Sequence, residues 1–234
     1  MNNILNNVFD KIYVINCGNE KNIKFQESKS NLQFEVVDLF KFPQTYDIFN
    51  LLSLYERTNC TNAFNLSLTL TYYNIIVNSY NKYDKILIFD DSFSLMKTEY
   101  INEYIEKLND DFDILQLSNN ENNIFVNNLF NDLYLNKIYF VKAENGFNSV
   151  NGLGLSKNGM AFIINFFENN KLSDINVPIF ENGNHCMFEL NHYISTIPFV
   201  YLEQNNDDEN LDKLKYNIMW IVLKTYYFNY VKRN

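Results

Sequence analysis

Two adjacent carboxylates, Asp90 and Asp91, follow a run of four large apolar residues, Ile86-Leu87-Ile88-Phe89. Such an unbroken run predicts a strand that is buried on both faces, as in parallel sheets. Ligands of open α/β sheets bind outside the carboxyl ends of the strands, so both acids are expected to face a cleft. Carboxylate oxygens suit Mg²⁺ or Mn²⁺, which in turn hold phosphates, and a metal or phosphate site is one hypothesis. The alternative is that the pair opens a turn, where Asp is common.

A second acidic stretch, Asp110-Asp111-Phe112-Asp113, has the spacing of a DxD motif in its last three residues. It precedes a predicted strand at 114–117 instead of following one. In a parallel arrangement it therefore lies at the opposite edge of the sheet from the cleft. This position favours a solvated turn over a metal site.

Hydrophobic periodicity places the elements around the acids. Residues 11–16 are apolar and β-branched and predict a first strand, and the polar stretch 17–22 predicts the loop after it. Such a loop either faces a nucleotide or is a plain connection. Between 63 and 80, apolar residues recur at three- and four-residue steps, which predicts an amphipathic helix that leads into the central strand. Residues 156–159 open another helix, with Ser156 as its N-cap.

The whole pattern predicts one α/β domain over residues 1–234, because no Pro/Gly/Ser-rich linker divides the chain. Further strands are predicted at 33–37, 138–141 and 199–202, and further helices at 46–54, 100–108 and about 211–231. For the C-terminal helix, packing on the core is one interpretation. Peripheral contact with a membrane surface, or docking on a partner, is the other.

Glycine and histidine positions leave two questions open. Gly152 and Gly154 are two of only six glycines, and they indicate either a close approach of the backbone to another group or a bulge in a strand. The histidines, His185 and His192, lack the i, i+4 spacing of a helical metal pair. A surface role or a satisfied core role is expected for each.

Charge and cysteine content limit the classes of function. The formal net charge is −9 without a basic cluster, which argues against a nucleic-acid partner. Cys17, Cys60 and Cys186 form no CxxC or Cys/His pattern and predict free thiols in a reducing compartment. We find no signal-peptide pattern and no apolar run of the ~18 residues that a membrane span needs. A cytoplasmic protein without a transmembrane segment is expected, in the host cytoplasm if the gene is viral.

Several short motifs occur in an order that resembles a known family. They are Tyr13-Val14-Ile15-Asn16, then Asn65-Leu66-Ser67, then the run from Ile86 to Ser92, then Asn151-Gly152 with Leu155-Ser156-Lys157-Asn158-Gly159, and then Val177-Pro178. In this order, over residues 11–178, the chain resembles the lipooligosaccharide and procollagen galactosyltransferases. The resemblance implies a GT-A-like (Rossmann-like) domain, with a mixed, mostly parallel central sheet flanked by helices.

The resemblance also implies a function and a set of site residues. The expected activity is transfer of a hexose, such as galactose or glucose, from a nucleotide-diphosphate sugar such as a UDP-sugar to a hydroxyl of a glycan or protein acceptor, with inversion. Asp90 and Asp91 would hold Mn²⁺ or Mg²⁺, and either Glu181 or Glu189 would deprotonate the acceptor. The donor would contact Val14, Asn16, Lys21, Ser67, Asp90, Asn151 and Gly152.

The chain departs from the family at the acidic motif. The family has Glu-Asp-Asp after the apolar run, whereas this chain has either Phe89-Asp90-Asp91 or Asp90-Asp91-Ser92, so one acid is missing. The family's histidine after Leu-Ser is Leu68 here. These departures support a second hypothesis, a degenerate GT-A domain that binds a ligand or partner without catalysis.

Overall fold

The structure is a computed structural model that describes residues 3–41, 63–95, 98–108, 110–117, 140–142, 152–169, 190–195 and 200–202. The chain divides into two units, Met1–Leu202 and Glu203–Asn234, and every described residue lies in the first. The helices predicted at 46–54 and about 211–231 lie outside the described residues.

Helices and strands are interspersed along the described chain, as expected for an α/β domain. In order they are α1 (Leu5–Val8), β1 (Lys11–Asn16), α2 (Glu20–Ser30), β2 (Glu35–Asp38), α5 (Ala63–Tyr80), β3 (Lys85–Asp90), β4 (Phe93–Leu95), α6 (Thr98–Ile105), β5 (Ile114–Gln116), β6 (Phe140–Lys142), β7 (Leu153–Ser156), α8 (Lys157–Asn169), β8 (His192–Ser195) and β9 (Val200–Leu202). The predicted strand 11–16 and helix 63–80 are confirmed with the same bounds. One expectation is wrong: the loop after β1 ends at Asn19, because Glu20 already begins α2.

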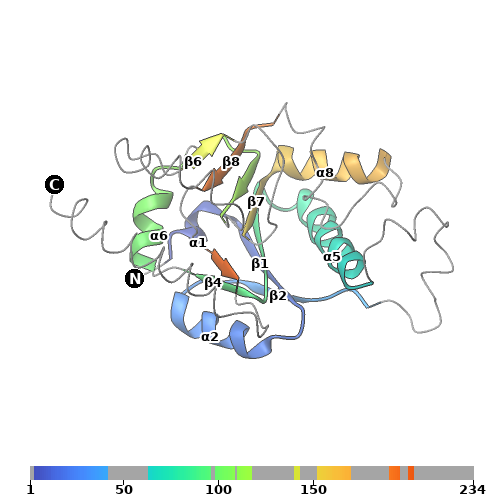
Figure 1. The fold of residues 1–234 in the computed structure, drawn as a ribbon. Coiled ribbons are helices and arrows are strands. Elements are labelled where there is room, and N and C mark those ends of the chain that lie inside the picture. The colour runs from blue at the N-terminus through green and yellow to red at the C-terminus, as the bar shows by residue number, and fades with distance from the viewer. Residues whose placement is uncertain are drawn as a thin grey trace, which may run out of the picture. The chain divides into compact units, whose positions relative to one another are not determined.

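The central sheet has seven strands in the order β2-β1-β3-β7-β5-β8-β6 (Figure 1). β1 pairs in parallel with both β2 and β3, and β5 pairs in parallel with β8. β7 runs antiparallel to its neighbours β3 and β5, and β6 runs antiparallel to β8. Five of the seven strands, β2, β1, β3, β5 and β8, thus run in the same direction, so the sheet is mixed and mostly parallel, as predicted.

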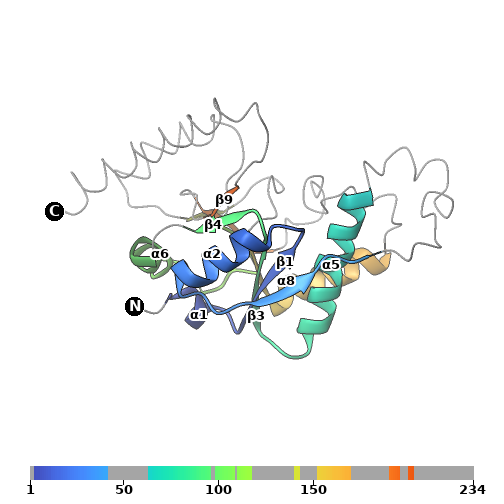
Figure 2. The ribbon, with the colours of Figure 1, turned by 90° about the horizontal axis from the view of Figure 1, so that it is seen from below.

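Helices α5 and α8 cover one face of this sheet, and α1, α2 and α6 lie on the other side (Figures 1 and 2). The strands β1 and β3 are buried on both faces, since their four middle residues point alternately to opposite sides and all are buried. Tyr13 and Ile15 of β1 and Ile86 and Ile88 of β3 pack with Tyr72 of α5 in the core under α5 and α8. The apolar run 86–89 is thus unbroken because β3 is buried on both faces of the sheet, as predicted.

A second sheet pairs β4 with β9 in antiparallel register, and Phe93 lies opposite Leu202. The strand predicted at 199–202 therefore exists, but it joins β4 and not the central sheet. β4 follows Asp91 and Ser92 directly, so the chain turns out of the central sheet at the acidic pair. Within the described residues, no helix is both long and apolar enough to cross a membrane.

Candidate functional site

The carboxyl ends of three parallel strands meet at one edge of the central sheet. In the register of the sheet, Asn16 at the end of β1 lies beside Asp38 at the end of β2, and Ile15 lies beside Asp90 at the end of β3. Asn16 Nδ2 donates a hydrogen bond to Asp38 Oδ1 at 3.0 Å. We call this place, formed by Asn16, Asp38, Asp90 and Asp91, the acidic edge. It is where an α/β sheet binds ligands.

Asp91 faces inward and holds the loop after β1. Asp91 is only 5% exposed, and its Oδ2 accepts hydrogen bonds from the backbone N–H groups of Cys17 and Asn19, each at 2.7 Å. Hydrogen bonds from amides to a carboxylate are short and about twice as strong as neutral ones. The described residues give Oδ1 no hydrogen bond, so that oxygen can accept one from a ligand or bind a cation.

Asp90 has a different role, in the turn that leaves β3. Its Oδ1 accepts hydrogen bonds from the backbone N–H of Ser92, at 2.8 Å, and from the Ser92 hydroxyl. Burial raises the pKa of the Asp90 carboxyl; the bonds from Ser92 act against this shift, and the charge of Asp91 adds to it. The turn predicted as the alternative role of the pair therefore exists. The Asp90 carboxylate in this turn is poorly solvated in its charged form.

The loop Cys17–Asn19 has its backbone amides occupied by the protein itself. Besides the two amides on Asp91, Gly18 N donates to Asn16 Oδ1 at 3.1 Å, and the Gly18 φ of 124° requires glycine there. Asn19 then caps α2, because its side chain accepts a hydrogen bond from Asn22 N. Lys21, predicted to contact the donor, is an exposed residue of the first turn of this helix. The loop is thus a built connection and not an open ring of N–H groups for a phosphate.

The thiol of Cys17 lies beside the acids, in a partly buried position. Burial, together with the charges of Asp91 and Asp90, raises its pKa to about 12. The thiol is therefore neutral at physiological pH and does not act as a nucleophile in this state.

Gly152 lies where the backbones of β3 and β5 are bridged. Its N–H donates to the carbonyl of Ile88 at 3.2 Å, and its carbonyl accepts from Leu117 N at 2.9 Å. Its φ of 77° explains why glycine occupies the position. Two residues later, a Cβ on Gly154 would lie 2.9 Å from the ring of Phe9. The close-approach interpretation is therefore right for Gly154, whereas Gly152 is explained by its positive φ.

Two of the residues that were predicted to contact the donor are buried. Val14 is 0% exposed in the middle of β1, so its side chain belongs to the core and its burial gives no support to contact with a nucleotide. Ser67 is 7% exposed in α5, and its carbonyl accepts the Thr71 hydroxyl at 2.7 Å. Asn151, Glu181 and Glu189 lie outside the described residues, so their predicted roles stay predictions.

Charge is distributed unevenly between the two edges of the sheet. Lys11 at the start of β1 pairs with Glu35 at the start of β2, at 2.7 Å, and Lys85 at the start of β3 pairs with Asp110. Lys157 lies 3.8 Å from Asp84 at the same edge. No ion pair within the described part of the chain involves Asp38 or Asp91. The acidic edge therefore carries the negative charge that a cation would neutralise.

The acidic edge fits a divalent ion only in part. Among the described residues, no group of three or more His, Cys, Asp or Glu side chains could hold a metal. Mg²⁺, however, is typically bound through one or two carboxylates, and substrate phosphates and water supply the other ligands. Asp90 and Asp91 supply two carboxylates, which is the number of protein ligands that such a site needs.

The rival acidic stretch lies where the sequence predicted, at the amino edge. Asp113 precedes β5, where its carboxylate accepts from the Ser156 hydroxyl at 3.1 Å and from Asn191 N at 3.0 Å. Asp110 and Asp111 are exposed. The prediction of a turn at the edge of the sheet opposite Asp90 and Asp91 is confirmed.

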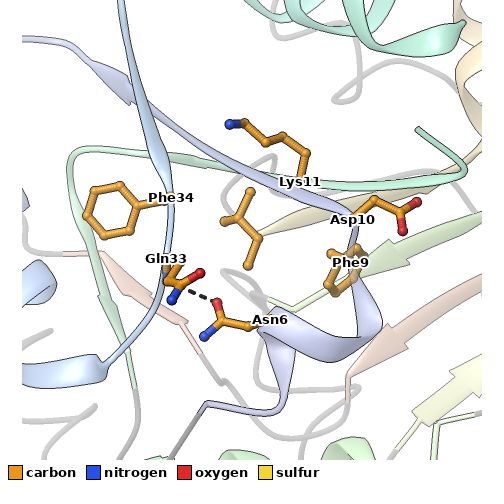
Figure 3. A pocket seen from close by; sticks show the side chains of 7 residues that line it. Asn6, Phe9, Asp10, Lys11, Gln33 and Phe34 are labelled. Carbon is orange, nitrogen blue, oxygen red and sulfur yellow. Dashed lines mark hydrogen bonds between the residues drawn. The ribbon is translucent and has the colours of Figure 1, made fainter. Parts of the chain in front are cut away.

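A pocket of about 240 Å³ also lies at the amino edge, at the opposite end of β1 from Asn16 (Figure 3). Figure 3 shows Asn6 and Gln33 at its margin, joined by the hydrogen bond from Gln33 N to Asn6 Oδ1 at 2.9 Å. The charged groups that line it are engaged: Lys11 pairs with Glu35, and Asp10 accepts the backbone N–H groups at 84 and 85. The pocket is therefore separate from the acidic edge.

Sequence reasoning missed Asp38 as a member of the acidic edge. The signal was present, because Asp38 directly follows the predicted strand 33–37, as Asp90 directly follows the apolar run 86–89. In dinucleotide-binding folds, an acid at this position contacts a ribose hydroxyl.

A scan of known protein-family models and a search of curated proteins found no match to this chain.

Proposed function

We propose that the chain is a nucleotide-sugar-dependent glycosyltransferase with a GT-A-like domain, which binds its donor at the acidic edge. The observation that carries the proposal is the convergence of Asn16, Asp38 and the Asp90-Asp91 pair at the carboxyl ends of three adjacent parallel strands. The mixed sheet, with β7 inserted antiparallel between β3 and β5, is compatible with such a domain.

The reaction would transfer a hexose, such as galactose or glucose, to a hydroxyl of a glycan or protein. The acceptor oxygen forms a bond to the anomeric carbon on the side opposite the leaving group. The bond from that carbon to the diphosphate breaks, and the nucleoside diphosphate leaves with the electron pair. A carboxylate, Glu181 or Glu189, takes the proton of the acceptor hydroxyl.

The protein's part is to bind and orient the donor. Asp91 Oδ1 and Asp90 supply carboxylate oxygens on the diphosphate side, and the amide of Asn16, already fixed by Asp38, contacts the nucleoside. A bound Mn²⁺ or Mg²⁺ would neutralise the charge that develops on the departing diphosphate. Gly152, whose N–H donates to the carbonyl of Ile88 near the end of β3, would lie beside the donor.

The second hypothesis, a binding domain without catalysis, has one observation in its favour. Asp91 Oδ2 and Asp90 Oδ1 are already occupied by groups of the protein, so each acid has a structural use that needs no ligand. A domain that had lost transferase activity would still keep both acids for these bonds.

Calorimetric titration with UDP, in the presence and absence of Mn²⁺, separates the two hypotheses. The transferase should bind UDP more tightly with Mn²⁺, and it should release UDP slowly from UDP-galactose or UDP-glucose. Asp90→Asn should lower the Mn²⁺-dependent part of the affinity. Asp110→Asn, an exposed acid at the amino edge, should not. No heat with UDP under either condition would refute the transferase.

A further inference from the structure

Asn22 connects α2 to the turn that carries the acids. Its side chain is buried, and Nδ2 donates to two carbonyl oxygens, that of Asp91 at 2.9 Å and that of Phe93 at 2.6 Å. A polar side chain inside a protein is stable only when it is hydrogen-bonded, and Asn22 is bonded to the backbone on both sides of the turn. The position of α2 therefore fixes the path of the chain as it leaves β3.

Asp91 makes the reverse connection, from the turn to the loop after β1. Its carboxylate accepts the N–H groups of Cys17 and Asn19, which are 74 and 72 residues distant in sequence. Asn19 in turn accepts Asn22 N at its carbonyl, at 3.0 Å, as the first residue before α2. Loop, turn and helix thus form a closed set of hydrogen bonds.

We propose that Asp91 and Asn22 are positioning residues of the acidic edge: they fasten the end of β1 to the end of β3, so that Asn16 and Asp90 meet a ligand in one fixed arrangement. The ligand in this proposal is the nucleotide diphosphate, so this part rests on the proposed function. The fastening itself does not, because it concerns only bonds within the protein.

The physical argument is preorganisation. Groups that bind a ligand are more effective when their neighbours hold them in place, because less freedom is lost on binding. In metal sites, loss of such supporting hydrogen bonds typically lowers affinity about 10- to 100-fold. The loop 17–19 follows β1 and the acidic turn follows β3, and the side chains of Asp91 and Asn22 join the two segments by hydrogen bonds.

The test compares Asn22→Ala with Asn3→Ala. Asn3 is also a buried asparagine with hydrogen bonds to the backbone, and Nδ2 donates to Ser30 O at the other end of α2, at 3.2 Å. Both variants lose a buried amide that holds the same helix. Hydrogen exchange of the backbone at 17–19 and the affinity for UDP with Mn²⁺ are measured well below the unfolding temperature of each variant.

We expect Asn22→Ala to accelerate exchange at 17–19 and to weaken UDP binding about 10-fold, while Asn3→Ala changes neither. Unchanged exchange in Asn22→Ala would overturn the fastening, and faster exchange with unchanged affinity would overturn the positioning. If Asn22→Ala does not fold, Asn22→Ser keeps a hydroxyl donor and should show the same effects at smaller size. If the wild type binds no nucleotide, the proposed function fails, and exchange alone decides on the fastening.

Discussion

Asp90 Oδ1 accepts a hydrogen bond from the backbone N–H of Ser92 at 2.8 Å, in the turn where β3 leaves the central sheet. An asparagine could accept the same bond without a charge. Burial raises the pKa of the Asp90 carboxyl, so the ionised form is disfavoured in the folded protein. The acid therefore costs stability at neutral pH in a position where a neutral residue could accept the same bond from the Ser92 N–H.

Asp90→Asn should raise the free energy of unfolding at pH 7. A carboxyl with a raised pKa in the folded state stabilises the fold only when protonated, so its cost disappears below the pKa of the unfolded chain, about 4. The gain of the variant over the wild type should vanish at that pH, grow as pH rises through the folded pKa, and then stay constant. Urea unfolding at a series of pH values measures it.

The outcome bears on function as well as on stability. A residue that destabilises the fold and is replaced with a gain is typical of a binding or catalytic position. If Asp90→Asn gains stability and loses Mn²⁺-dependent UDP binding, the cost has a functional cause. A loss of stability at pH 7 would contradict the argument, because Asp90 would then act as a structural acid.

The burial of His192 predicts that the folded protein loses stability in acid. The residue is 2% exposed in β8, and burial lowers its pKa to about 4. A group with a lowered folded pKa contributes stability that is present above its unfolded pKa of about 6.5 and is lost as pH falls toward 4. The full loss is about 3 kcal/mol at ~1.4 kcal/mol per pKa unit. His192→Gln should have a smaller decrease in unfolding free energy between pH 6.5 and 4, and equal slopes would contradict the prediction.

Cys17 should react slowly in the folded protein. Its pKa of about 12 leaves very little thiolate at pH 8, and alkylation proceeds through the thiolate. Iodoacetamide should modify Cys17 at least about 100-fold more slowly in buffer than in guanidinium chloride. Mass spectrometry of the peptides separates Cys17 from Cys60 and Cys186. Rapid modification in buffer would mean that the loop opens away from Asp91.

The sequence predicted the strands and helices whose apolar residues follow a period. β1, β3 and α5 were predicted closely because each buries a continuous or periodic apolar surface, and a pattern within one segment is enough to show this. Ser156 is confirmed as an N-cap, since its hydroxyl accepts Gly159 N at 3.2 Å. Such local signals need no knowledge of the rest of the fold.

Helix α2 was missed because it packs through amides. Asn22, Gln26 and Ser30 recur every four residues and are buried, whereas a sequence pattern treats such residues as solvent-facing. Their partners lie far along the chain: Gln26 Oε1, for example, accepts Leu95 N at 3.4 Å. The role of Asp91 was missed for the same reason, because it depends on a contact across 74 residues of sequence.

The last prediction concerns the start of α8. A Cβ on Gly159 would lie 2.1 Å from the carbonyl oxygen of Asp113. That oxygen is fixed, because it accepts a hydrogen bond from Ser156 N at 2.9 Å, and the Asp113 N–H donates to Asn191 O at 2.8 Å. Gly159→Ala should therefore lower the free energy of unfolding by about 1–3 kcal/mol, although alanine favours helices.

The matched control is Asn158→Ala, at the exposed position before Gly159 in the same turn of α8. It adds no atom near Asp113 and places the best helix former in the helix, so urea unfolding should show no loss. If both alanine variants are as stable as the wild type, Gly159 lies farther from the carbonyl oxygen of Asp113 than a Cβ distance of 2.1 Å implies. A loss confined to Gly159→Ala means that the glycine is needed for the helix to begin directly against the acidic stretch at the amino edge.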